Sequence, residues 1–101
     1  MSTYGKTTAA EAAEVERISL SYIVDSYAHN AGYEPKINAA EVADYLMQHG
    51  GCPDSISGVK RWVYRSVYAA LQRLKRDGRI ESSYALVNGR ETRCYNPKCL
   101  A

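Results

Sequence analysis

Phenylalanine is absent from this chain of 101 residues, which instead holds nine tyrosines and one tryptophan, Trp62. The aromatic part of a core must therefore come from side chains whose polar ends need a partner or water. Three cysteines, an odd number, do not form the disulfide framework of a small secreted protein. No apolar run approaches the length of a membrane span, and residues 1–14 lack the apolar centre of a signal peptide. We therefore expect one globular, cytoplasmic domain.

Charge is distributed unevenly along the chain, although the net charge is only +2. Residues 1–50 carry three basic and seven acidic side chains, a balance of 3 − 7 = −4. Residues 51–101 carry ten basic and four acidic ones, a balance of 10 − 4 = +6. This asymmetry favours one basic face directed at a polyanion. The alternative is an ordinary solvated surface.

The basic residues concentrate between Val59 and Arg79, where seven of 21 residues are Lys or Arg. Apolar residues recur there at helical spacing and predict one buried face, formed by Val59, Val63, Val67, Ala70, Leu71 and Leu74. The opposite side holds Arg61, Arg65, Tyr68, Gln72 and Arg76. We predict a helix over residues 56–77, which ends at a left-handed Gly78.

A hairpin is predicted over residues 79–96, because Asn88-Gly89 separates two strand-like runs and favours a type I′ turn. A two-residue loop sets the register, and it pairs Val87 with Arg90, Ala85 with Thr92 and Tyr84 with Arg93. We expect Ile80, Tyr84 and Tyr95 to share the face that packs on the helices. Residues 97–101 form a tail after the hairpin.

Two further helices precede the basic one. Thr8 and Glu11 form a capping box, which predicts a helix over residues 8–31 after a flexible N-terminus of residues 1–7. Asn38, with Glu41 three residues later, predicts a helix over residues 38–49. The first helix has apolar side chains on two sides, so it is either buried widely or meets a second copy of the chain.

The predicted order of helix, helix, helix and hairpin is a mostly helical α+β fold. A short strand near Pro35–Ile37 would add a third strand to the small sheet.

This pattern resembles a winged helix-turn-helix domain over about residues 15–96. The run VYAALQRLKRDGRI, from Val67 to Ile80, is similar to the end of the recognition helix and the start of the wing in small prokaryotic, archaeal and viral transcription regulators. The run from Asn88 to Tyr95 resembles the wing. The resemblance implies sequence-specific binding of double-stranded DNA by a homodimer, with the third helix in a major groove and the wing on the backbone or minor groove. We expect the dimer to form through the first helix.

The residue types agree with DNA binding. Arg61 and Arg65 lie one helical turn apart and suit bidentate contacts to guanine or phosphate. Arg73 lies nearer the buried face, so a DNA contact and a packing role are equally expected for it. Trp62 and Tyr64 are expected to pack at the edge of the core. The expected DNA contacts are Lys60, Arg61, Arg65, Ser66, Tyr68, Gln72, Arg76, Arg79, Arg90 and Arg93.

The main alternative function is a winged-helix protein–protein module that docks an acidic partner. Binding of RNA or single strands is a third possibility, because the chain is rich in tyrosine. Enzyme activity is not expected, since no nucleophile motif or phosphate-binding loop is present. No metal or cofactor is expected either, because the spacing of His49, Cys52, Cys94 and Cys99 is too loose for a zinc site.

Overall fold

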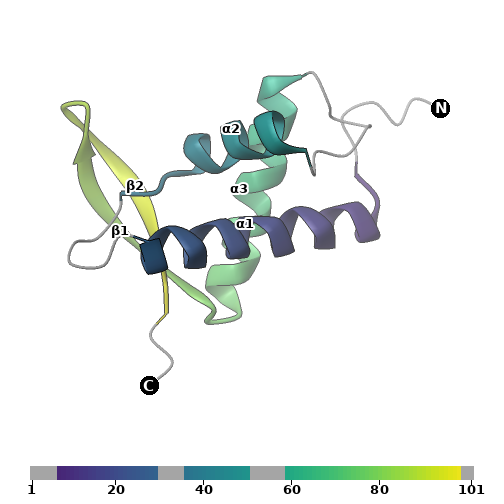
Figure 1. Cartoon of the computed structure of the whole chain (residues 1–101), viewed down its shortest axis with the longest axis horizontal. Helices are drawn as coiled ribbons and strands as arrows, with labels where there is room; N and C mark the ends of the chain where they lie inside the picture. Colours follow the sequence, from purple (N-terminus) through teal and green to yellow (C-terminus); the bar gives the residue numbers. More distant parts are fainter. Residues whose placement is uncertain (1–6, 30–35, 51–58, 99–101) are drawn as a thin grey trace.

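The computed structural model describes residues 7–29, 36–50 and 59–98 (Figure 1). The elements are, in order, α1 (Ala9–His29), α2 (Ala39–His49), α3 (Lys60–Arg76), β1 (Ile80–Val87) and β2 (Arg90–Pro97). Three helices followed by an antiparallel hairpin make a mostly helical α+β fold, consistent with a winged-helix-like topology. The predicted fold class is confirmed. In this described part of the chain, no helix combines the length and the apolar character needed to cross a membrane.

Side-chain caps start the first two helices. The Glu11 amide donates to Thr8 Oγ1 at 3.1 Å, and the Thr8 amide donates to Glu11 Oε1 at 2.9 Å, so the predicted capping box is present. Before α2, the Glu41 amide donates to Asn38 Oδ1 at 2.9 Å. Both predicted helix starts are thereby confirmed. Residues 30–31, the predicted end of the first helix, lie outside the described residues.

α3 begins at Lys60 with Val59 as its N-cap, and residues 56–58 of the predicted helix lie outside the described residues. The helix ends as predicted at a left-handed Gly78, whose φ is 75°. The Gly78 amide donates to the Lys75 carbonyl at 3.0 Å, and the Arg79 amide donates to the Leu74 carbonyl at 2.9 Å. This pair of bonds is a Schellman motif, and it directs the chain from the helix into β1.

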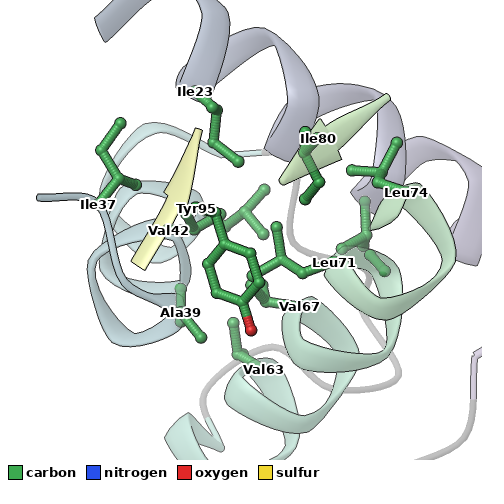
Figure 2. Packing of buried hydrophobic residues seen from close by; sticks show 14 residues of the cluster. Ile23, Ile37, Ala39, Val42, Val63, Val67, Leu71, Leu74, Ile80 and Tyr95 are labelled. Carbon is green, nitrogen blue, oxygen red and sulfur yellow. The ribbon is translucent and has the colours of Figure 1, made fainter. Parts of the chain in front are cut away.

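α3 lies at the centre of the fold and packs against α1, α2 and β1 (Figure 1). Its buried residues are Val63, Val67, Ala70, Leu71 and Leu74, as the helical spacing predicted, whereas Val59, also predicted to be buried, is a half-buried N-cap. Figure 2 shows these side chains meeting Val42 from α2, Ile23 from α1, and Ile80 and Tyr95 from the hairpin. Each fully buried aliphatic side chain contributes about 1.5–3 kcal/mol by leaving water, so this contact is the main source of stability.

Both apolar sides of α1 pack against other parts of the same chain. Val15, Ser19 and Ile23 are buried, and the Ser19 hydroxyl donates to the Val15 carbonyl at 2.7 Å, which satisfies the buried polar group. The side chains that are partly buried against the same core are Ile18, Leu20, Tyr22 and Tyr27. Val24 remains exposed, with 44% of its surface accessible. Wide burial within one chain therefore accounts for most of the two-sided pattern of α1.

The hairpin has the predicted register and turn. Val87 pairs with Arg90, and Tyr84 pairs with Arg93. Asn88 and Gly89 both have positive φ, 54° and 79°, as a type I′ turn requires. The segment that enters α2 lies beside β2, where the Ile37 carbonyl accepts the Tyr95 amide at 2.8 Å. The third strand predicted near Pro35–Ile37 falls partly outside the described residues, because Pro35 is not among them; the sheet of the described residues has two strands.

The prediction that Tyr84 packs on the helices is wrong. Ile80 and Tyr95 are buried at the base of the hairpin, but 60% of the Tyr84 surface is accessible. Tyr84 lies four residues beyond Ile80 along a twisted strand, and the apolar surface of the three helices ends before it reaches this position. The Tyr84 ring packs beside Arg93 instead.

The centre of the core generates a first prediction. Leu71→Ala is expected to lower the free energy of unfolding by about 2–5 kcal/mol, because the Leu71 side chain is fully buried between elements that cannot close the cavity completely. The matched control is Leu86→Ala on the wing, where 66% of the leucine surface is accessible and the change should stay within about 0.5 kcal/mol. Urea unfolding measures both, and equal losses in the two variants would contradict the packing described.

The contact between α1 and α2 generates a second prediction, about alkaline pH. The Tyr22 hydroxyl donates to Glu41 Oε2 at 2.5 Å. Burial, followed by this hydrogen bond, raises the pKa of Tyr22 from its ordinary value of 10.0 to about 12. The protonated hydroxyl therefore stabilises the fold fully below pH 10, and that contribution is lost as pH rises from about 10 to about 12.

The measurement is urea unfolding of the wild type and of Tyr22→Phe at neutral pH and at increasing alkaline pH. The variant should be less stable than the wild type at neutral pH, and the difference should shrink as Tyr22 ionises. A difference that stays constant across this pH range would show that Tyr22 does not titrate as described.

Candidate nucleic-acid interface

The residues that α3 exposes to solvent follow from the residues that it buries in the core. Because Val63, Val67 and Leu71 point into the core, the residues half a turn away must point out. Arg61 and Arg65 are exposed on this side. Within the described part of the chain, neither forms an ion pair with a carboxylate. Both guanidinium groups are therefore available to an external anion.

The other predicted contacts on this face are Tyr68, Gln72 and Arg76. Tyr68 and Arg76 are exposed, and Gln72 is half-buried. Arg76 Nε lies 3.5 Å from Asp77 Oδ1, and Lys60 Nζ, at the start of the helix, lies 3.8 Å from Asp44 Oδ1. Exposed pairs of this kind are weak, so they leave both cations able to exchange partners.

Arg73 is directed toward α1 instead. Its Nε donates to Glu16 Oε1 at 2.8 Å, and only about a third of each side chain is accessible, 34% and 27%. Of the two roles weighed for Arg73, the geometry favours packing, because the pair joins α3 to α1.

Two predicted DNA contacts lie on the α1 side rather than on the outward face. Ser66 borders a hollow of about 350 Å³ together with Ala12 of α1 and Arg65. Arg79 borders a separate hollow with Ala13 and Leu20 of α1. The structure therefore brings Ser66 together with Arg65, whereas Arg79 borders a different hollow and Arg61 borders neither. Their expected role as DNA contacts requires a ligand that extends around the helix.

The wing carries the remaining predicted contacts. Arg90 is exposed beside the turn. Arg93 is held in place, because its Nη2 donates to the Tyr84 hydroxyl at 2.8 Å and its guanidinium carbon lies 5.3 Å from the centre of the Tyr84 ring. This geometry combines a hydrogen bond with a cation–π contact. The hydrogen bond that Arg93 donates to Tyr84 also raises the pKa of Arg93.

A tyrosine-lined hollow lies between α3, the wing and the start of α2, and the sequence did not predict it. Its volume is about 180 Å³. The residues that line it are Asn38, Ala39, Ala40, Tyr64, Tyr68, Thr92, Arg93 and Tyr95. We call it the tyrosine hollow. Tyr95 is one of these residues, and Figure 2 shows the ring of Tyr95 packed among core residues of α2 and α3. Burial raises the pKa of the Tyr95 hydroxyl.

Tyr64 was expected to pack at the edge of the core, but its side chain is exposed in the structure. Tyr64 and Tyr68 are 43% and 41% accessible, and their rings are nearly parallel, at 7°, with centres 6.5 Å apart. Trp62, by contrast, is packed against the core as expected. The four-residue spacing of Tyr64 and Tyr68 in the sequence could have predicted this pair, because it places both rings on one side of the helix.

The candidate zinc ligands are only partly described. Cys52 and Cys99 lie outside the described residues. Cys94 is a free, buried thiol whose pKa is raised by burial. Among the residues that the structure places, no three side chains of His, Cys, Asp or Glu gather as metal ligands.

Comparison of the chain with protein-family models, with curated proteins and with solved structures finds no match.

Proposed function

We propose that this protein binds double-stranded DNA sequence-specifically as a winged helix-turn-helix transcription regulator. In this proposal α3 enters a major groove, and the wing lies along the sugar–phosphate backbone or the minor groove. The observation that carries the proposal is the position of Arg61 and Arg65, exposed on the side of α3 opposite the core and without carboxylate partners among the described residues.

The charges of the neighbouring elements support the same orientation. Arg90 and Arg93 place two cations on the wing, which also carries Glu81 and Glu91, while the carboxylates of Glu14 and Glu16 lie on α1. A protein with this arrangement attracts DNA to one side and releases counterions there. Phosphate contacts from the wing would fix the position of the duplex, and Arg61 and Arg65 would read base edges.

Homodimerisation through α1 is part of the proposal. Two copies would place two α3 helices on successive half-sites of a pseudo-palindromic sequence. On α1, Val24 is the large apolar side chain that remains exposed for such a contact. Sedimentation of the wild type and of Val24→Asp tests this element separately from DNA binding.

The second candidate function is a protein–protein module. The wing exposes Tyr84 and Leu86, at 60% and 66%, and exposed apolar side chains of this size favour a protein partner more than a phosphate backbone. An acidic partner would complement the arginines beside them. This alternative expects no binding to DNA even at low salt.

DNA binding is tested by fluorescence anisotropy with a random duplex of about three helical turns, at about 50 mM and about 200 mM salt. The wild type should bind at low salt and weaken steeply as salt increases. Arg61→Ala and Arg65→Ala should each weaken binding and lower the slope of log K against log salt by about 1.

The matched control is Arg17→Ala, which removes the same charge from the exposed surface of α1, where Arg17 pairs with Glu14. This variant should bind DNA nearly as well as the wild type. Equal losses for Arg17→Ala and Arg65→Ala would mean that binding depends on net charge and not on the outward face of α3. No binding by the wild type at low salt would contradict the proposal and favour the protein–protein module.

A further inference from the structure

The tyrosine hollow has the composition of a site for a flat, polar ring. Tyr64 and Tyr68 from α3 present nearly parallel rings that are each about two-fifths accessible, 43% and 41%. Thr92, Arg93 and Tyr95 of β2 also line the hollow. Exposed aromatic rings are an unfavourable surface in water, and a base stacked on one replaces that contact with water by a contact with another π-face.

The size of the hollow limits what it can hold. Its volume of about 180 Å³ is well below the ~300–1,000 Å³ of sites that enclose a whole drug-sized ligand. The hollow therefore suits one ring system, with the rest of the ligand outside. A nucleobase attached to a strand that continues along the protein surface has this form.

The charge around the hollow favours a ligand with phosphate groups. Its lining, as the described residues define it, includes one cation, Arg93, and no carboxylate. Arg93 donates a hydrogen bond to the Tyr84 hydroxyl at 2.8 Å, which orients its guanidinium group without a ligand. On α3, Arg61 lies three residues before Tyr64, and Arg65 lies three residues before Tyr68. A proline-rich peptide would also stack on tyrosine, but it would bring no negative charge to these arginines.

One hydrogen-bonding group in the lining suits the edge of a base. Asn38 lines the hollow, and its Oδ1 accepts the Glu41 amide as a helix cap. The amide nitrogen of Asn38 remains a hydrogen-bond donor.

We propose that the tyrosine hollow binds an unpaired nucleobase, so that this protein prefers DNA in which a single-stranded segment adjoins a duplex. The inference rests on the proposed function, because the arginines of α3 and of the wing would hold the adjoining phosphates. It adds to that function a second kind of recognition, in which Tyr64 and Tyr68 stack on a base that is outside the double helix.

The test compares two DNA ligands with equal numbers of phosphates, so that their total charge is the same. One is a blunt duplex, and the other has a shorter duplex with a single-stranded extension of about four nucleotides. 2-Aminopurine in the extension reports stacking by a loss of its fluorescence. The wild-type chain should bind the extended ligand more tightly by about fivefold to a hundredfold, the range of one base–aromatic contact, and should quench 2-aminopurine.

The variants separate the aromatic rings from the rest of the surface. Tyr64→Leu/Tyr68→Leu should reduce the ratio of the two affinities to about one, whereas Tyr64→Phe/Tyr68→Phe, which keeps both rings, should retain the ratio. Both pairs change exposed side chains, and equal thermal unfolding midpoints would verify that the fold is intact.

Three outcomes would overturn the inference. Equal affinity of the wild type for both ligands, without quenching, would contradict the inference and leave the proposed binding of duplex DNA standing. Competition for the tyrosine hollow by a polyproline peptide, together with equal affinities, would assign the hollow to a protein partner. No binding to either DNA at low salt would overturn the proposed function itself.

Discussion

The contact between the buried face of α3 and its neighbours is the constraint on which the rest of this structure depends. Val63, Val67 and Leu71 are fully buried, and α1, α2 and β1 all pack against this helix. Once that face is fixed toward the core, the direction of the opposite side follows from helical geometry. The exposure of Arg61 and Arg65 is therefore a consequence of core packing. The same packing fixes the side toward which Arg73 points, and it brings Arg73 to Glu16.

Tyr95 connects this core to the candidate site. In a chain without phenylalanine, the aromatic residue at the base of the wing carries a hydroxyl, which cannot be buried without a partner or an opening to water. Tyr95 is 1% accessible, and it also lines the tyrosine hollow. Arg93, two residues earlier on the same strand, lies on the same side of the hairpin and lines the hollow as well. Tyr95 thus belongs both to the core and to the lining of the hollow.

Features that depend on a few neighbouring residues could be predicted from the sequence. The caps at Thr8 and Asn38, the left-handed Gly78 and the turn at Asn88-Gly89 are local, and all four agree with the structure. The buried face of α3 was predictable because its spacing is regular over four turns. The fold class followed from the order of these elements.

Features that depend on where the core ends could not be predicted in this way. Tyr84 has the strand periodicity of a buried residue, but the helices do not extend far enough to cover it. Tyr64 lies at the boundary of the buried face, where a small rotation of the helix decides between packing and exposure. Ser66 and Arg79 were grouped with the outward arginines by charge and position, although α1 borders both of them.

The central claim is that the outward face of α3 and the adjoining wall of the wing form one surface for DNA. The most direct test is a ¹⁵N–¹H correlation spectrum of the labelled protein during titration with duplex DNA. Amide shifts should change around Arg61 and Arg65 and at Thr92 and Arg93, while those of Ser21 and Asp25 on α1 should stay nearly constant. Changes concentrated on α1, with the α3 and wing amides unaffected, would contradict the account.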